Sequence, residues 1–307
     1  MCCIATNCRP HARHSNEVRT VPGSDLILQF KKKESCRSLR ASRFFHISFR
    51  IAAVKISAVI ITKNEADNIA GAIKSLDWAD EVLVVDSEST DDTREIAAAS
   101  GARVLTQPWL GFAAQKQFAV DNAVNNWIFS LDADERISLK LKDEILRLKS
   151  LNESELAQGY RIPRLSTYMG RQIRGGGWYP DWQLRLFDRN FGKWKDVAIH
   201  ESVEMDPNAR VEKLAGDILH HSVTTPEYHH KMIGERYAPL AAKQMFADGR
   251  RTSPFKVRTV GWTTFIHTYF LKGGFRDGFA GFVIARFAAH HAFLKHLMLW
   301  EMQNKKK

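Results

Sequence analysis

Two aspartates separated by a single residue, Asp132 and Asp134, are the side chains in this sequence best suited to chemistry. They follow the apolar run 127–131, which is typical of a buried strand. Carboxylates crowded at one strand end repel each other, and a divalent cation relieves that repulsion. Mg²⁺ and Mn²⁺ prefer carboxylate oxygens and bridge proteins to substrate phosphates. The spacing alone is weak evidence, because a capped turn into a helix beginning at Ser138 would also explain it.

The elements that must position these acids alternate along the chain. We expect strands at 56–62, 81–85, 103–106 and 127–131, with helices at 66–76, between Ser89 and Gly101, and at 112–123. This order predicts a parallel sheet with right-handed crossovers. Ligands of such sheets bind beyond the carboxyl ends of the strands. Polar residues collect at those predicted ends: Lys63, Asn64, Glu65, Asp86 and Ser87, besides the two aspartates.

Glycine-rich phosphate-binding loops are absent from the sequence. No GxGxxG pattern follows the first predicted strand, and no Walker A pattern occurs. The sequence therefore indicates neither a nicotinamide dehydrogenase nor a P-loop enzyme. A metal ion, rather than a glycine loop, would hold a diphosphate at this sheet.

Three segments in this order, 59–69 (VIITKNEADNI), 84–93 (VVDSESTDDT) and 127–135 (WIFSLDADE), resemble family 2 glycosyltransferases with the GT-A fold. Segments 111–117 (GFAAQKQ) and 183–187 (QLRLF), followed by His200-Glu201, resemble the branch that adds glucose or a related sugar to the lipopolysaccharide inner core. The resemblance spans about residues 55–300. Gln117 departs from that branch, in which asparagine is expected.

The resemblance implies an α/β fold: a Rossmann-like, mostly parallel sheet flanked by helices, with a C-terminal amphipathic helical region. It also implies a metal-dependent, inverting transfer of a hexose from a UDP-sugar to a saccharide acceptor. Among the implied contacts, Glu65 and Asp86 meet the ribose and the base. The full set of expected nucleotide-sugar contacts is Thr62, Asn64, Glu65, Asp86, Lys116 and Asp132.

The metal site implied by the resemblance uses Asp134 as the direct ligand of Mg²⁺ or Mn²⁺. Related enzymes often add a histidine well after the Asp-x-Asp pair, and the apolar run ending at His220 matches that position. We favour His220 over His221. Zinc is disfavoured, because no cysteine lies near these histidines and no HExxH pattern occurs.

The second half of the chain supplies the expected acceptor side. An inverting transfer needs a general base, and Glu201 matches the family's His-Glu pair. Asp181 and Asp196 are the alternatives, and His200 either orients Glu201 or packs. The remaining candidates are Trp178 and Tyr179, in a glycine-rich segment that suits either a mobile lid over a sugar or an ordinary hairpin loop, and Arg185, which could face a phosphate or a buried acid.

The net charge of +11 over 307 residues is unevenly distributed. Residues 1–55 carry +8, residues 56–214 carry −5, and residues 215–307 carry +8. Residues 1–53 lack helix or strand periodicity and hold all four cysteines. We expect them to be a disordered or misannotated extension, the native chain beginning at Val54, with a transit peptide as a further alternative. Without them no cysteine remains, which fits a reducing compartment.

The predicted organisation has three parts: residues 1–53; a catalytic domain at 54–223, with a nucleotide-sugar half at 54–150 and an acceptor half at 151–223; and a basic helical region at 224–307. That last region carries aromatic residues at helical spacing, and no stretch long enough to span a bilayer. It predicts peripheral association with the anionic inner face of the cytoplasmic membrane, and hence a lipid-linked acceptor. The same side chains could instead pack on the catalytic domain.

Two other function classes fit the sequence less well. A sugar nucleotidyltransferase would share the sheet and the metal carboxylates, but segment 62–65 lacks the expected glycine- and lysine-rich first loop. A basic protein that binds membranes or nucleic acid without catalysis would have no use for acids at three strand ends. We therefore expect a glycosyltransferase with no nucleic-acid partner.

Overall fold

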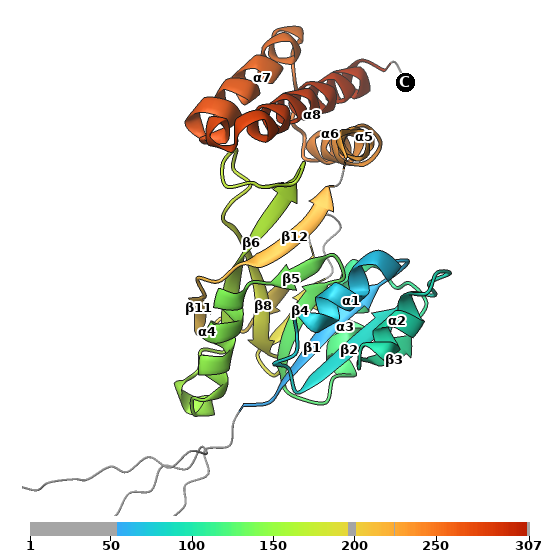
Figure 1. Ribbon diagram of the computed structural model, residues 1–307. Helices are drawn as coiled ribbons and strands as arrows, with labels where there is room; N and C mark the ends of the chain where they lie inside the picture. Colours follow the sequence, from blue (N-terminus) through green and yellow to red (C-terminus); the bar gives the residue numbers. More distant parts are fainter. Residues whose placement is uncertain (1–53, 196–200, 224, 306–307) are drawn as a thin grey trace, which may run out of the picture. The chain divides into compact units, whose positions relative to one another are not determined.

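A ten-stranded sheet organises the molecule (Figure 1). The computed structural model describes residues 54–195, 201–223 and 225–305, all of which belong to one unit of the chain, Ala53–Lys307. The predicted extension at 1–53 lies outside the described residues. In the principal path of the sheet the strands follow the order β3-β2-β1-β4-β8-β6-β12-β5, and β7 and β11 pair with β6.

The first half of the fold confirms the predicted alternation of strands and helices. Its elements are β1 (Ile56–Thr62), α1 (Ala66–Lys74), β2 (Glu81–Asp86), α2 (Thr93–Ala99), β3 (Arg103–Thr106), α3 (Phe112–Asp121), β4 (Trp127–Asp132), β5 (Glu135–Ile137) and α4 (Leu139–Lys149). Strands β1 to β4 pair in parallel. The short strand β5 was not predicted: it separates the Asp132–Asp134 turn from the helix that Ser138 caps.

Apolar side chains leave both faces of β1 and pack under different helices. Ile56, Ala58 and Ile60 point to the face covered by α1, α2 and α4, whereas Val59 points to the face covered by α3. A strand buried on both faces reads as a continuous apolar run, which is why this half was visible in the sequence.

The second half extends the sheet with mixed pairing. Its elements are η1 (Glu153–Glu155), β6 (Gly159–Tyr168), β7 (Arg171–Gln172), β8 (Asp181–Asp188), β9 (Gly192–Lys195), β10 (Ser202–Met205), β11 (Val211–Lys213) and β12 (Ile218–Val223). Strand β8 runs antiparallel to both β4 and β6, whereas β12 runs parallel to β6. Strands β9 and β10 form a separate two-stranded sheet.

The C-terminal region is helical, as predicted, and lies beyond the ends of β6 and β12 (Figure 1). Its elements are α5 (Pro226–Lys231), the π-helical η2 (Met232–Tyr237), α6 (Ala238–Ala247), α7 (Pro254–Ile266), the π-helical η3 (His267–Leu271), η4 (Gly274–Asp277) and α8 (Gly278–Asn304). Within the described ranges, no helix is long and apolar enough to cross a bilayer.

The glycine-rich segment is docked on these helices. Asp277, which is buried, accepts hydrogen bonds from the backbone N–H groups of Arg174 (3.2 Å) and Gly175 (2.6 Å). A Cβ at Gly175 would lie 2.4 Å from the carbonyl oxygen of Gly273, so only glycine permits this approach. The segment is therefore a wall held by the C-terminal helices in this structure.

Candidate active site

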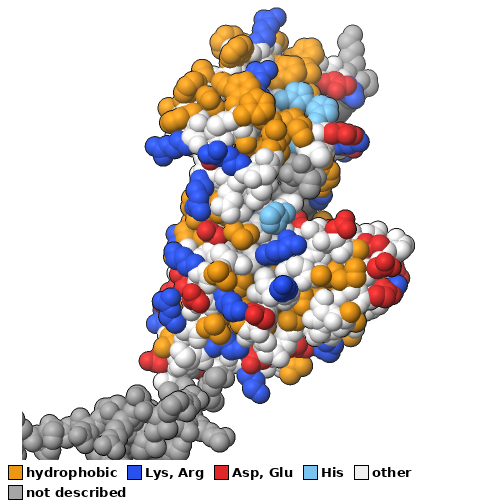
Figure 2. Space-filling model, viewed as in Figure 1, with side chains coloured by type: hydrophobic (Ala, Val, Ile, Leu, Met, Phe, Trp, Pro, Cys, Tyr) orange, Lys and Arg blue, Asp and Glu red, His pale blue; other side chains and the backbone are white. Residues whose placement is uncertain are grey.

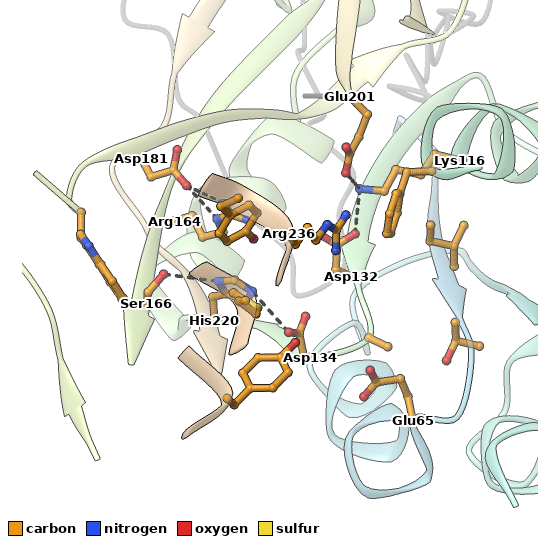
Figure 3. Close-up of a pocket in the computed structure, with 18 of the residues that line it drawn as sticks. Glu65, Lys116, Asp132, Asp134, Arg164, Ser166, Asp181, Glu201, His220 and Arg236 are labelled. Carbon is orange, nitrogen blue, oxygen red and sulfur yellow. Dashed lines mark hydrogen bonds and ion pairs between the residues drawn. The ribbon is translucent and has the colours of Figure 1, made fainter. Parts of the chain in front are cut away.

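A cavity of about 1140 Å³ opens beyond the carboxyl ends of β1 and β4 (Figure 3). This is where ligands of open α/β sheets bind. Eight of the twelve predicted site residues line it: Thr62, Glu65, Lys116, Asp132, Asp134, Trp178, Glu201 and His220.

Asp134 and His220 lie side by side at one end of the cavity (Figure 3). The Nε2 atom of His220 is 3.3 Å from Oδ2 of Asp134. The antiparallel pairing of β12 with β5 sets His220 opposite Glu135, next to the turn that carries Asp134. The other ring nitrogen, Nδ1, lies 3.3 Å from the hydroxyl of Ser166, which orients the ring. His221 does not line the cavity.

Glu65 stands at the start of α1 near the same end (Figure 3). Burial raises the pKa of its carboxyl, a hydrogen bond from Asn68 opposes that rise, and the negative charge of Asp134 adds to it. Nearby, the hydroxyl of Thr62 is buried and has no hydrogen-bond partner within the described part of the chain. This end of the cavity thus has unused polar capacity.

Lys116 holds two carboxylates of the cavity together. Its Nζ atom lies 2.9 Å from Oδ1 of Asp132 and 3.4 Å from Oε1 of Glu201. The side chain is almost fully buried and also lies over the ring of Trp194, 4.8 Å from its centroid. Lys116 therefore links the Asp-x-Asp turn to Glu201.

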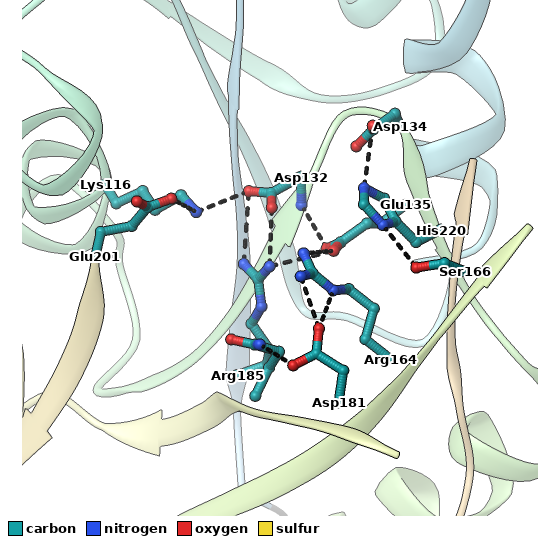
Figure 4. A network of polar contacts seen from close by, with 11 residues as sticks. Lys116, Asp132, Asp134, Glu135, Arg164, Ser166, Asp181, Arg185, Glu201 and His220 are labelled. Atoms are coloured by element: carbon teal, nitrogen blue, oxygen red, sulfur yellow. Dashed lines mark hydrogen bonds and ion pairs between the residues drawn. The ribbon is translucent and has the colours of Figure 1, made fainter. Parts of the chain in front are cut away.

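A network of buried charges lies behind Asp132 (Figure 4). Nη2 of Arg185 is 2.8 Å from Oδ2 of Asp132 and 3.2 Å from Oε1 of Glu135, a fully buried carboxylate. Arg164 continues the network from Glu135 to Asp181. Burial alone would raise the pKa of Asp132, but the charges of Arg185 and Lys116 hold it well below its ordinary value.

Four of the predicted site residues do not line the cavity. Arg185 meets buried acids, which was one of the two alternatives for it. Both carboxylate oxygens of Asp86 accept hydrogen bonds from Ser89, and Asp86 is fully buried. The side-chain oxygen of Asn64 accepts a hydrogen bond from the backbone of Thr90, and the hydroxyl of Tyr179 donates to Asp217.

Of the alternatives for a general base, Asp181 lines the cavity but is engaged by Arg164 and Gln183. Asp196 and His200 lie outside the described residues. Gln117, where asparagine was expected, accepts a hydrogen bond from the backbone N–H of Trp194 at 2.8 Å, so its side chain anchors β9.

The sequence analysis missed the contribution of the C-terminal helices to the cavity. Arg236 of η2 reaches into it and lies over the ring of Phe112, 5.9 Å from its centroid. No motif marks these residues; the signal was only their position after β12. The other missed lining residues include Arg164, Ser166, Tyr228, His229 and Met232.

The donor set was tested for a metal ion. Within the described ranges, no group of three or more His, Cys, Asp or Glu side chains is arranged to hold one. Asp134 and His220 nevertheless supply a carboxylate oxygen and an imidazole nitrogen at one point of the cavity. Mg²⁺ and Mn²⁺ sites often use one or two protein ligands and complete their shell with water and substrate phosphate. The pair fits such a site.

Known proteins resemble this chain over most of its length. The family model described as glycosyl transferase family 2 matches residues 57–202. An uncharacterized glycosyltransferase from Rickettsia typhi is 35% identical over 261 residues, covering 82% of this chain and 88% of its own. The lipopolysaccharide core biosynthesis glycosyltransferase LpsC from Rhizobium meliloti is 30% identical over 258 residues, covering 82% and 94%.

Solved structures were also matched. Glucosyl-3-phosphoglycerate synthase from Mycobacterium tuberculosis, in complex with Mn²⁺, UDP and glucosyl-3-phosphoglycerate, is 28% identical with a TM-score of 0.29, over 38% of this chain and 45% of that one. Mannosyl-3-phosphoglycerate synthase from Rubrobacter xylanophilus is 15% identical with a TM-score of 0.40, over 66% and 77%. The family model and the long matches to Rickettsia and Rhizobium enzymes establish that the chain belongs to glycosyltransferase family 2.

Proposed function

We propose that the protein transfers a hexose from a UDP-sugar to a saccharide of the lipopolysaccharide inner core, with inversion at the anomeric carbon and with Mg²⁺ or Mn²⁺ bound. The observation that carries this proposal is the arrangement of Asp134 and His220 at one end of a single cavity that also contains Glu201. The name of LpsC supports the choice of acceptor.

In this proposal the chain divides the work between two groups of residues. Asp134 and His220 hold the metal, which would neutralise charge on the leaving diphosphate. Thr62 and Glu65 contact the nucleoside, for which the Thr62 hydroxyl is suited because it has no partner among the described residues. Direct contacts from Asn64 and Asp86 are further parts of the proposal that the donor-bound enzyme would test. Arg236 lies where it can approach the diphosphate from the opposite wall.

On the acceptor side, Glu201 removes the proton of the attacking hydroxyl as that oxygen bonds to the anomeric carbon. The bond from that carbon to the diphosphate breaks in the same step. Lys116 positions Glu201 at a fixed distance from the donor through its contact with Asp132. Trp178, which lines the cavity, offers an aromatic face for the acceptor sugar. Most of the catalytic effect is then electrostatic preorganisation.

We also propose that the acceptor is lipid-linked and that the protein acts at the inner face of the cytoplasmic membrane. Exposed aromatic and basic residues on the C-terminal helices support this location (Figure 2). The domain division at residue 223 remains part of the proposal.

A panel of UDP-sugars tests the activity. Each donor is offered with Mg²⁺ or Mn²⁺, with and without chelator, together with heptose-containing core acceptors. We expect UDP release with one donor, dependent on metal and on acceptor. Release of pyrophosphate would contradict glycosyl transfer, and full turnover in chelator would contradict the metal assignment.

A further inference from the structure

A second cavity, of about 340 Å³, lies between α5 and α8, apart from the catalytic one. The two cavities share no lining residue. Three of its six lining residues form an apolar half, and the other three, the polar half, carry side-chain nitrogen atoms. Its lining residues are His230, Phe282, Val283, Arg286, Phe287 and His290.

The polar half contains one permanently charged side chain, that of Arg286. The rings of His230 and His290 stack with centroids 5.6 Å apart, and Arg286 lies beside them. Within the described part of the chain, Arg286 has no carboxylate within ion-pair distance, and no acid lines the cavity. Burial lowers the pKa of His290, and the nearby His230 and Arg286 lower it further. An anion placed here would offset this repulsion.

The apolar half continues into a large exposed aromatic surface (Figure 2). Phe282 lines the cavity and also lies 5.8 Å from Phe265 and 6.4 Å from Phe279, measured between ring centroids. Along α8 the exposed residues fall on one face of a helix that is about 40 Å long. That stripe consists of Phe279, Phe282, Arg286, Phe293, Leu297 and Trp300.

The same surface extends onto the neighbouring elements. Phe255 and Trp262 of α7 are 74% and 69% exposed, and Leu271 of η3 is 76% exposed. Patches of this kind mark interaction sites, because monomeric proteins rarely leave them uncovered.

Charge indicates which partner covers this surface. From α7 to the end of α8, residues 254–304, the acids are Asp277, which is buried and engaged by the backbone of Arg174 and Gly175, and Glu301, which is paired with Lys305. The basic residues of the same segment are Lys256, Arg258, Lys272, Arg276, Arg286 and Lys295. A second copy of the chain would bring the same positive charge to the contact. A lipid with a phosphate head and acyl chains matches both halves of the cavity.

We propose that the cavity between α5 and α8 binds the phosphate of an anionic membrane phospholipid through Arg286, His230 and His290, while an acyl chain lies along the aromatic stripe of α8. This rests on the proposed membrane location and specifies the lipid contact within it. The bound headgroup would lie close to the catalytic wall, because Phe287 of this cavity packs on His229 of the other, with ring centroids 4.3 Å apart.

Flotation of the full chain with vesicles tests the proposal. Vesicles of phosphatidylglycerol and phosphatidylcholine in equal parts are compared with vesicles of phosphatidylcholine alone. Each unit of positive charge at such a surface strengthens binding by roughly a factor of five. Arg286→Glu changes the charge by two units, so we expect it to weaken binding to the anionic vesicles by about 30-fold. The matched control is Lys74→Glu, an equal charge change at an exposed site at the end of α1.

The outcomes separate the alternatives. Equal losses in Arg286→Glu and Lys74→Glu, or equal binding of the wild type to both vesicles, would overturn the site. So would inorganic phosphate binding as tightly as vesicles of the same phosphate content, since the cavity would then be a free-phosphate site. A dimer that is lost with Phe279→Ser, without vesicle binding, would assign the surface to a second copy.

Donor turnover measured in detergent, without vesicles, tests the proposed activity independently of lipid binding. Arg286→Glu should retain that turnover while losing vesicle binding. If the wild type shows no turnover of the donor, that result counts against the proposed function and not against the lipid site. A melting temperature equal to that of the wild type shows that Arg286→Glu folds.

Discussion

The two walls of the catalytic cavity are built from different chemistry. The wall at the ends of β1 and β4 carries ionised groups that are paired with one another, such as Asp132 with Lys116 and Arg185. The wall made by the docked glycine-rich segment and α5 carries aromatic and neutral side chains, such as Trp178 and His229. The first wall is therefore mainly charged and the second mainly aromatic, although Arg236 of η2, which follows α5, also lines the cavity.

The pKa values of the two walls show the same contrast. Asp132 stays ionised because neighbouring cations outweigh its burial. His229 stays neutral because burial, helped by the charge of His291, lowers its pKa to about 4. At neutral pH the carboxyl of Asp132 is therefore charged, and the imidazole of His229 is uncharged.

The largest effect on stability is expected from removing Arg185, the cation that lies behind Asp132. Arg185→Met should lower the free energy of unfolding by about 3 kcal/mol, because the fully buried Glu135 then keeps only Arg164 as an ion-pair partner, and the partly exposed Asp132 keeps only Lys116, among the described residues. Urea denaturation measures this loss. Adding Glu135→Gln to Arg185→Met should recover part of it; no recovery would mean that the weakened pairing of Glu135 is not the cause of the loss.

Asp134→Asn should abolish most of the donor turnover while leaving the stability of the protein unchanged. We expect turnover of the donor to fall by at least about 100-fold, the scale of losing a preorganised electrostatic contact. The melting temperature should stay unchanged, because Asp134 has one ion-pair partner, His220, within the described residues. Asp143→Asn, at an exposed site on α4, is the control, and equal activity in both variants would end the metal assignment.

Acid should weaken the aromatic wall first. His229 has a lower pKa in the folded chain than its ordinary 6.5, so the unfolded chain binds more protons in this range. Its contribution is complete above pH 6.5 and is lost as the pH falls towards 4. We expect wild-type unfolding free energy to drop by about 3 kcal/mol more than that of His229→Gln over this range. If the unfolding free energies of the wild type and of His229→Gln fell in parallel with pH, His229 would not be held neutral by the fold.

His220→Asn should weaken metal binding by about 10- to 100-fold, and His221→Asn should leave it unchanged. Only His220 faces Asp134 across the cavity end. Titration with Mn²⁺, followed calorimetrically in the presence of UDP, measures the difference. If His221→Asn has the larger effect, the assignment between the two neighbours is reversed.

The smallest effect is expected at the aromatic wall. Trp178→Ala should raise the KM for the acceptor about tenfold, the scale of one aromatic contact, with little change in kcat. Tyr179→Phe is the neighbouring control, because its hydroxyl binds Asp217 outside the cavity. A fall in kcat alone would indicate that this wall acts on the chemistry rather than on binding.

The charged wall was largely predictable from the sequence, and the aromatic wall was not. Strands such as β1 and β4 are continuous apolar runs, so their ends, and the acids at those ends, could be located. The meeting of His220 with Asp134 depends on the antiparallel pairing of β12 with β5, and no local pattern specifies which distant strands pair.

Arg185 shows the limit most clearly. The alternation in segment 183–187 places it on a polar face, but that face is interior because Glu135 and Asp132 meet it there. Arg236 was missed for the same reason: its approach to Phe112 joins elements that are far apart in the chain. Long-range packing decides such contacts, and periodicity carries no information about it.

The hydrogen bonds from Arg174 and Gly175 to Asp277 have a consequence for the order in which the nascent chain matures. Strands β1 to β4 leave the ribosome first and can assemble their sheet while synthesis continues. The glycine-rich segment leaves next, but its anchor is more than a hundred residues downstream. Until that anchor emerges, the cavity lacks the wall that the glycine-rich segment forms, so the carboxylates at the ends of β1 and β4 can be in place before the cavity is complete.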